Sequence, residues 1–113
     1  MKVLVVEDEP VSAKMLENDL ASLGADKVKI FNNGSDILDH LDTSRYDLLI
    51  IDMQLPDIDG VKLIRSIRQT DLVTKIIVVS GTVNREVFDK CVGLGIEDIL
   101  CKPYDKNRLA QHL

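Results

Sequence analysis

Short apolar runs recur along the chain, and a stretch with apolar residues at helical spacing follows each of them. The runs cover residues 2–6, 28–31, 48–51, 75–79 and 99–101. Runs of this length, rich in valine, isoleucine and leucine and bounded by polar residues, are typical of buried strands. The pattern therefore predicts five strands, each followed by a helix.

The predicted helices rest on apolar residues that recur every three or four positions, a spacing that places them on one helix face. The sets are Leu16, Leu20 and Leu23; Ile37, Leu38 and Leu41; Leu63, Ile64 and Ile67; and Val87, Phe88, Cys91 and Val92. We expect each set to form one buried stripe. A fifth helix of about two turns is expected over residues 106–113.

Residues that favour helix ends stand between these elements. Pro10 suits a first helical turn, where its missing N–H costs no hydrogen bond, and Asp59 suits a helix cap. Gly24 and Gly95 suit helix ends in the left-handed conformation. These positions agree with the boundaries that the apolar pattern predicts.

Buried strands that alternate with helices are typical of a parallel sheet with right-handed crossovers. We therefore expect a doubly wound α/β fold, in which a five-stranded parallel sheet carries helices on both faces. No linker or low-complexity segment divides residues 1–113, so the chain is predicted to form one domain.

The composition fits a globular domain and argues against several classes of function. Hydrophobic residues make up 45% of the chain, and no window approaches the roughly 18 apolar residues of a membrane span. Fourteen basic and nineteen acidic residues give a net charge of -5, which disfavours nonspecific nucleic-acid binding. Three acids at positions 7–9 cut off the first apolar run, so it does not resemble a secretory signal and we expect a cytoplasmic protein.

The two cysteines, Cys91 and Cys101, are far apart in the sequence and have no neighbours at metal-binding spacing. Free cysteines behave as small apolar residues. We expect both to be thiols of the core.

Chemically reactive residues follow the predicted strands. In a doubly wound sheet the functional crevice lies at the carboxyl ends of the strands. Glu7 and Asp8 follow the first run, Asp52 the third, Ser80 the fourth and Lys102 the fifth. Each residue alone has a simpler interpretation, as a helix cap, a turn residue or a solvated side chain. Together they predict a site that combines three carboxylates, a hydroxyl and an ammonium group.

Three adjacent carboxylates repel one another, so either one is protonated or a cation lies among them. Oxygen ligands with room for water suit Mg2+, or alternatively Mn2+, better than zinc. The formal charges of three carboxylates, Lys102 and a divalent metal sum to zero. Such a site suits a phosphoryl group, with one of the acids as the nucleophile.

Over essentially its whole length the chain resembles the receiver domains of two-component response regulators, the CheY-like family. The resemblance rests on the acidic pair Glu7-Asp8, on Asp52 at the end of the third strand and on the following segment LPDIDG at 55–60. Ser80 at the end of the fourth strand and the pair KP at 102–103 complete it. The resemblance implies the flavodoxin-like strand order 2-1-3-4-5.

The resemblance also implies a role for each site residue. Asp52 would be the phosphoacceptor, while Glu7, Asp8, Asp52 and the backbone carbonyl of Gln54 would hold Mg2+. Ser80 and Lys102 would bind phosphoryl oxygens, and the Lys102-Pro103 peptide is expected to be cis.

As a receiver, the chain would take its phosphoryl group from a phosphohistidine and lose it again by hydrolysis. It would be a self-modifying substrate rather than a turnover enzyme. The charge gained at Asp52 would bias the fourth helix and the fifth strand between two arrangements.

The sequence departs from the family pattern at two places. Ile99 occupies the switch position, three residues before Lys102, which is usually aromatic in the family. The last helix is expected to be a few residues shorter than usual, which fits either an excised receiver or a minimal stand-alone one.

The resemblance implies a histidine kinase or a histidine phosphotransfer protein as partner. We expect its helical bundle to dock on the first helix around Val11, Lys14 and Met15, with the loop at Leu55 and Pro56. For Met15, partial core packing is an equal alternative. The face formed by helix 4, strand 5 and helix 5 would serve an output domain or a homodimer, without nucleic acid or membrane as partner.

Other interpretations of the acids fit less well. A flavodoxin would need small and hydroxyl residues where residues 7–10 read EDEP, since acids repel a phosphate. A metal-dependent nuclease could use Asp57 and Asp59, but these lie beside Gly60, where turn formation and helix capping explain them. A haloacid-dehalogenase phosphatase would need an acid at the position of Gln54. The remaining alternative is a receiver that binds partners without being phosphorylated.

Overall fold

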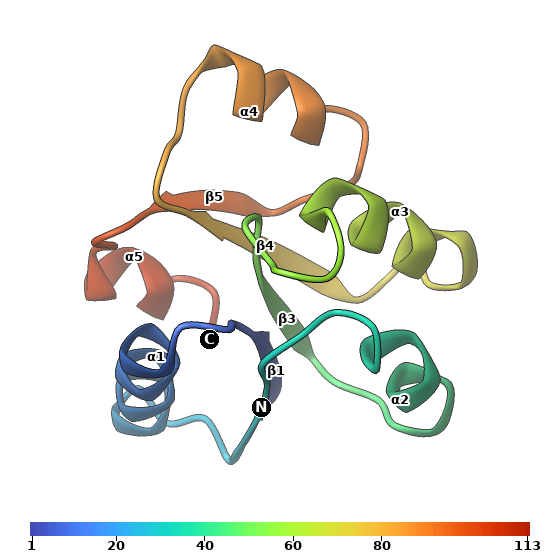
Figure 1. The fold of residues 1–113 in the computed structure, drawn as a ribbon. Coiled ribbons are helices and arrows are strands. Elements are labelled where there is room, and N and C mark those ends of the chain that lie inside the picture. Colours follow the sequence, from blue (N-terminus) through green and yellow to red (C-terminus); the bar gives the residue numbers. More distant parts are fainter.

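The computed structural model describes residues 1–113 and alternates strands with helices along the whole chain (Figure 1). The strands are β1 (Lys2–Val6), β2 (Lys27–Phe31), β3 (Leu48–Asp52), β4 (Lys75–Ser80) and β5 (Asp98–Cys101). The helices are α1 (Pro10–Ser22), α2 (Ile37–Thr43), α3 (Gly60–Thr70), α4 (Arg85–Cys91) and α5 (Lys106–Ala110). No helix combines the length and the apolar character that crossing a membrane requires.

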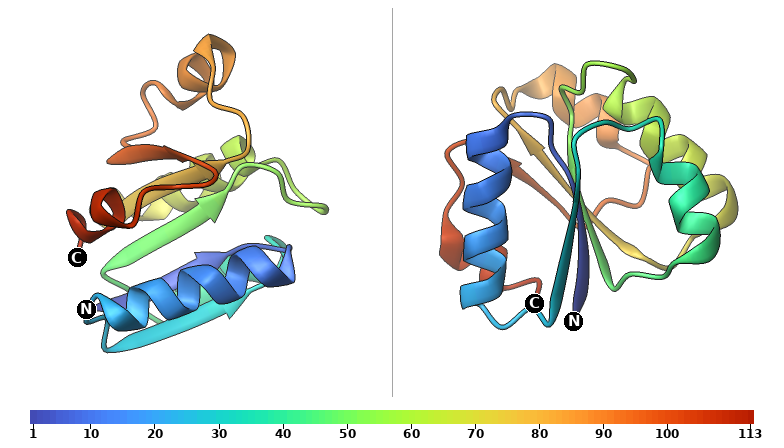
Figure 2. Two further views of the ribbon diagram at one scale, coloured as in Figure 1. Left: turned by 90° about the vertical axis from the view of Figure 1, so that its left-hand side faces the viewer. Right: turned by 60° about the horizontal axis from the view of Figure 1, so that its bottom comes forward.

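The strands form one parallel sheet in the order β2-β1-β3-β4-β5, which confirms the predicted fold class and strand order. Helices α1 and α5 cover one face of the sheet, and α2, α3 and α4 lie on the other (Figure 2). The direction of winding reverses between β1 and β3, which are neighbours in the sheet. The carboxyl ends of these two central strands therefore flank the crevice that this fold offers for function.

Each face of the sheet has its own apolar core. One cluster joins the sheet to α2, α3 and α4 through residues such as Ile37, Ile64 and Cys91. The other joins it to α1 and α5 through residues such as Leu16 and Leu109. Strands β1, β3 and β4 are buried along nearly their whole length, as predicted, whereas β2 and β5 are largely half-buried or exposed because they form the edges of the sheet.

The predicted helix boundaries agree with local geometry at several ends. Pro10 opens α1, and the carboxylate of Glu9 caps this helix by accepting hydrogen bonds from Val11 N at 3.1 Å and Ser12 N at 2.7 Å. Gly24 follows α1 with φ of 98°, a conformation that residues with a side chain rarely adopt. Asp59 caps α3 by accepting from Val61 N at 2.8 Å.

The last helix is shorter than predicted, since α5 covers Lys106–Ala110 and only turn structure follows it. Cys101 also differs from the prediction, because its side chain is exposed while Cys91 is buried. Cys101 belongs to an edge strand whose side chains alternate between the faces, so burial of Leu100 leaves Cys101 outside.

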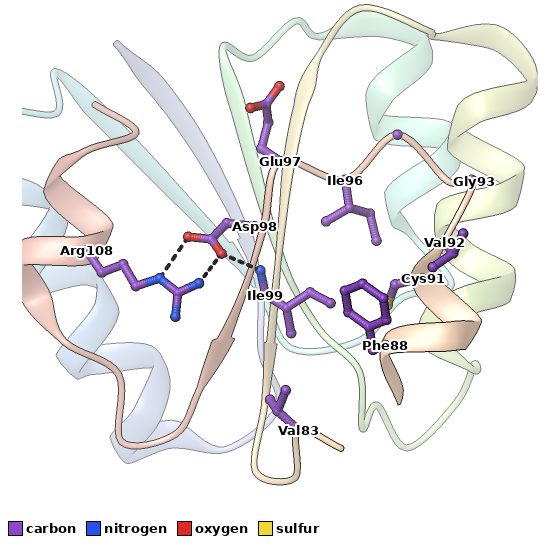
Figure 3. A pocket seen from close by; sticks show the side chains of 11 residues that line it. Val83, Phe88, Cys91, Val92, Gly93, Ile96, Glu97, Asp98, Ile99 and Arg108 are labelled. Carbon is purple, nitrogen blue, oxygen red and sulfur yellow. Dashed lines mark hydrogen bonds and ion pairs between the residues drawn. The ribbon is translucent and has the colours of Figure 1, made fainter. Parts of the chain in front are cut away.

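Helix α4 does not bury the whole stripe that its spacing predicts. Cys91 is its buried residue, but Phe88 and Val92 are 55% and 63% exposed. The helix stands away from β5, and a cavity of about 850 Å³ lies between them, lined by Phe88, Ile96 and Ile99 among others (Figures 1 and 3). The apolar spacing is therefore correct for a helix, but its packing on the sheet is incomplete.

Candidate functional site

The five residues singled out from the sequence all lie at the carboxyl edge of the sheet. Glu7 and Asp8 follow β1, Asp52 and Ser80 are the last residues of β3 and β4, and Lys102 follows β5. Parallel strands bring these ends to the same edge, so positions far apart in sequence share one site.

Asp52 is at the centre of this arrangement and is only 5% exposed. Its Oδ1 accepts a hydrogen bond from the Gln54 N–H at 2.8 Å, and its Oδ2 accepts one from Lys102 Nζ at 3.0 Å. The buried strand β3 thus ends on a carboxylate whose two oxygens are both held by hydrogen bonds. Gln54 also pairs with Asp59 across the following loop.

Glu7 is more deeply buried than Asp52 and shares its cation, because Lys102 Nζ also donates to Glu7 Oε1. Burial and side-chain hydrogen bonding with Asp52 raise the pKa of Glu7 to about 7, against the opposing effect of Lys102. One ammonium group therefore bridges two buried carboxyl groups, of which Glu7 has its pKa raised to about 7.

The pKa values of Asp52 and Lys102 shift in the directions that favour charge. Burial acts to raise the pKa of Asp52, but hydrogen bonds with Glu7, Gln54 and Lys102 together lower it. Burial likewise acts against the ammonium of Lys102, yet its bonds to Glu7 and Asp52 raise its pKa. Asp52 is thus the more acidic carboxyl group of the pair, and Lys102 is its counter-ion.

Three carboxyl groups of this site lie within reach of one cation. Oxygen atoms of Glu7, Asp8 and Asp52 lie within 4.8 Å of one another, and Asp8 is the exposed member of the set. An all-oxygen ligand set that is open to water on one side fits a hard divalent ion such as Mg2+. Burial and the neighbouring Asp52 raise the pKa of Glu7, and a cation bound among these oxygens would favour the ionised form of Glu7.

Ser80 lies at the same edge but bonds away from the acids. Its buried hydroxyl donates to the Thr82 carbonyl at 2.7 Å and accepts from the Thr82 N–H at 3.2 Å. A cavity of about 170 Å³ lies beside it, with Gln54, Thr82 and Lys90 among its lining residues. Ser80 therefore lines a small open space, while its hydroxyl is bonded to the backbone of the loop that follows β4.

The loop from Met53 to Asp59 is held against the neighbouring loop by Asp57. The carboxylate of Asp57 accepts hydrogen bonds from Gly34 N at 3.0 Å and Ser35 N at 2.8 Å. A side chain on Gly34 would collide with Ile58, because its Cβ would lie 2.2 Å from Ile58 Cγ2. The sequence assigned Asp57 to a turn, whereas the residue connects two loops, a contact for which local sequence contains no signal.

The structure also places two residues of α1 and its cap, Glu9, which was expected to lie outside the site, and Met15, for which the sequence left two alternatives. Glu9, next to the acidic pair, caps α1, so it is not part of the acid cluster. The side chain of Met15 on α1 is 53% exposed and that of Val11 is 66% exposed, so Met15 lies at the surface and is not part of the core. The Lys102-Pro103 peptide is cis, as expected.

Comparison with known proteins points to one family. The family model described as response regulator receiver domain matches residues 3–113. "Regulator of RpoS" from Escherichia coli is 39% identical over 111 residues, which are 97% of this chain and 33% of that protein. Sensor histidine kinase RcsC, also from Escherichia coli, is 33% identical over 113 residues, which are 100% of this chain and 12% of that protein.

Solved structures agree with these matches. The receiver domain of sensor histidine kinase PA1611 from Pseudomonas aeruginosa has a TM-score of 0.87 and 29% identity, covering 97% of this chain and 91% of that one. That structure contains a magnesium ion coordinated in its active site cleft. This chain spans a third or less of the length of the two curated relatives named above.

Proposed function

The chain belongs to the family of response regulator receiver domains of two-component systems, and from this membership we propose that Asp52 is its phosphoacceptor. The observation that carries the proposal is the setting of Asp52. Its buried carboxylate ends a central strand, accepts a hydrogen bond from Lys102 at 3.0 Å and lies beside Glu7 and Asp8. Residues 1–113 would act together as one phosphoacceptor domain.

The proposed reaction moves a phosphoryl group from a histidine to Asp52. A carboxylate oxygen of Asp52 attacks phosphorus, an O–P bond forms and the P–N bond of the phosphohistidine breaks, leaving its electron pair on the imidazole nitrogen. Asp52 suits this role because its lowered pKa keeps it ionised and therefore nucleophilic. Hydrolysis of the acyl phosphate would return the free carboxylate, so the domain catalyses its own modification and reset.

Glu7, Asp8 and Asp52 would hold Mg2+, with Mn2+ as an alternative, and the backbone carbonyl of Gln54 would complete the protein ligands. The bound ion would neutralise the negative charge that develops on the oxygens of the phosphoryl group during transfer. Oxygens of the three carboxyl groups lie within 4.8 Å of one another, which supports this assignment, as does the magnesium ion in the PA1611 receiver.

Lys102 and Ser80 would bind two of the phosphoryl oxygens. Lys102 is already bonded to Asp52, so its ammonium lies next to the oxygen that would carry the phosphoryl group. For Ser80, the exchange of its Thr82 partner for a phosphoryl oxygen would draw the loop after β4 toward the site. This movement is the proposed first step of signalling, and it does not depend on an aromatic side chain at position 99, where this chain has isoleucine.

The proposed donor is a histidine kinase or a histidine phosphotransfer protein that docks on α1 near the site. The exposed side chains of Val11 and Met15 support this surface, together with Lys14 and the loop at Leu55 and Pro56. The proposed output or homodimer face is formed by α4, β5 and α5. The apolar side chains exposed at the cavity between α4 and β5 support it (Figure 3).

Mass spectrometry after incubation with phosphoramidate and Mg2+ tests the assignment of Asp52. We expect the protein to gain the mass of one phosphoryl group, and the gain to need both Mg2+ and Asp52. Asp52→Asn should abolish it, because an amide is a poor nucleophile. A protein that gains nothing, or an adduct that survives Asp52→Asn, would show that Asp52 is not the acceptor and would favour an unphosphorylated interaction module.

A further inference from the structure

The segment that carries Lys102 is anchored on both sides. Before the turn, the Lys102 N–H donates to the Ser80 carbonyl at 2.8 Å, which extends the pairing of β4 with β5. After Pro103, the Tyr104 hydroxyl donates to Asp19 Oδ2 on α1 at 2.6 Å. The backbone of Lys102 is therefore fixed on one side by its hydrogen bond to β4 and on the other by the hydrogen bond between Tyr104 and α1. From this position its ammonium group donates to Glu7 and Asp52.

Tyr104 is fixed by its ring as well as by its hydroxyl. The ring packs, half-buried, against the core cluster that joins the sheet to α1 and α5. Burial and the hydrogen bond to Asp19 raise the pKa of Tyr104, so its hydroxyl remains a donor at neutral pH. A phenol in such surroundings needs a hydrogen-bond partner, and Asp19 is the one that it has.

Helix α1 connects this tether to the acid cluster. The helix begins directly after the loop that carries Glu7 and Asp8, and Asp19 follows Pro10 by roughly two and a half turns. Helix α1 is thus connected through the chain to Glu7 and Asp8 at its first turn, and through the hydrogen bond between Asp19 and Tyr104 to the segment that carries Lys102. A fixed α1 sets the position of both groups relative to Asp52.

We propose that the Tyr104–Asp19 hydrogen bond positions Lys102 for phosphoryl transfer, which makes Tyr104 and Asp19 positioning residues of the site. The inference rests on the proposed function of Asp52. Lys102 is a long, flexible side chain, so holding its backbone in place lowers the conformational entropy that it loses when its ammonium meets a phosphoryl oxygen. Neither residue touches the reacting atoms.

The test measures the rate at which phosphoramidate phosphorylates Asp52 at saturating Mg2+. A small donor is used because it reports on the chemistry without a partner docked on α1. We expect Tyr104→Phe, which removes only the hydroxyl, to lower this rate about three- to tenfold, the range that one hydrogen bond contributes. The affinity for Mg2+ should stay within about twofold of the wild type, because the hydroxyl does not contact the acids.

A matched control comes from the second tyrosine of the chain. Tyr46 also carries a hydrogen-bonded, half-buried hydroxyl, but its partner is His40 on the α2 side of the sheet. We expect Tyr46→Phe to leave the rate unchanged. Asp19→Asn keeps an acceptor oxygen for Tyr104 and should retain most of the rate, whereas Asp19→Leu should match Tyr104→Phe. All rates are compared at a temperature at which circular dichroism shows each variant folded.

A background without the lysine separates positioning from general stability. In Lys102→Ala, the further change Tyr104→Phe should have no additional effect on the rate, because the group that it positions is gone. A persistent additional loss would overturn the inference, as would an unchanged rate in Tyr104→Phe alone or an equal loss in Tyr46→Phe. A wild-type protein that gains no phosphoryl group on Asp52 would instead overturn the proposed function, and this inference with it.

Discussion

At the residue scale, the state of the site depends on how protons and charge are divided among Glu7, Asp52 and Lys102. Glu7 and Asp52 are both nearly buried and both bond to Lys102. Their pKa values nevertheless shift in opposite directions, to about 7 for Glu7 and below the usual range for Asp52. The backbone N–H of Gln54 donates to Asp52, and this helps to decide which acid ionises first.

This division predicts how stability depends on pH when no metal is bound. The pKa of Glu7 is about 7 in the folded chain and 4.5 ordinarily, so the folded state binds the proton more tightly. The resulting contribution to the free energy of unfolding is full below about pH 4.5 and is lost as pH rises through about 7. Denaturant unfolding in EDTA should therefore show stability that declines between about pH 5 and 8.

Two variants isolate the contribution of Glu7 to that decline. Glu7→Gln should flatten the profile, because the amide does not titrate. Glu97→Gln, at an exposed glutamate before β5, should keep the wild-type slope. A wild-type profile without a decline, or the same slope in Glu7→Gln, would contradict the predicted protonation of Glu7.

At the scale of the element, α3 and α4 have similar apolar spacing but differ in how many of those apolar side chains they bury. Helix α3 buries Leu63, Ile64 and Ile67 against the sheet. Helix α4 buries Cys91 and leaves Phe88 at the mouth of the cavity beside Ile99 (Figure 3). Since burial, not spacing, provides the hydrophobic stabilisation, α4 is the more weakly held helix of the two.

Alanine substitution should reveal this difference as a difference in the free energy of unfolding. We expect Phe88→Ala to lower the free energy of unfolding by less than about 1 kcal/mol, because the exposed ring makes few contacts with the protein that the substitution could remove. Ile64→Ala, at a fully buried position, should cost about 2–5 kcal/mol. A cost above about 3 kcal/mol for Phe88→Ala would mean that α4 closes on β5 and buries the ring in solution.

At the scale of the whole molecule, the three carboxylates come from two central strands and their loops, so a bound cation would hold those strands together. An ion that binds only the folded chain raises its stability by mass action, by about 2.7 kcal/mol at a concentration 100 times the dissociation constant. The domain should therefore become more stable in excess Mg2+.

Asp8→Asn should remove most of this Mg2+-dependent gain in stability, because it removes the charge of one of the three carboxylates whose oxygens would hold the ion. Glu9→Gln is the matched control, since it removes the neighbouring charge from a residue that caps α1 instead. Thermal unfolding with Mg2+ and with EDTA gives the gain for each variant. An equal reduction in both variants would indicate that diffuse charge, not a defined site, attracts the ion.

Much of the fold and of the candidate site follows from local patterns in the sequence. Short continuous apolar runs and period-3.6 apolar spacing predict the alternation of strands and helices, and strand-end residues such as Glu7, Asp52 and Lys102 follow from that alternation. Packing that depends on distant partners does not follow. Local sequence does not reveal that Asp57 would reach Gly34, that Cys101 would be exposed or that α4 would stand off the sheet.

The sequence by itself determined which chemical groups reach the carboxyl edge of the sheet, because the short-range pattern marks where each strand ends and strands that alternate with helices run parallel, whereas the strand order came from the family resemblance. Only the tertiary structure decided how those groups divide their charge and which segments hold them in place. The pKa of Glu7 depends on burial and on Asp52, and the position of Lys102 depends on Tyr104 meeting Asp19 across the fold. These are contacts between residues far apart in the chain, and their energies arise only when packing excludes water around them.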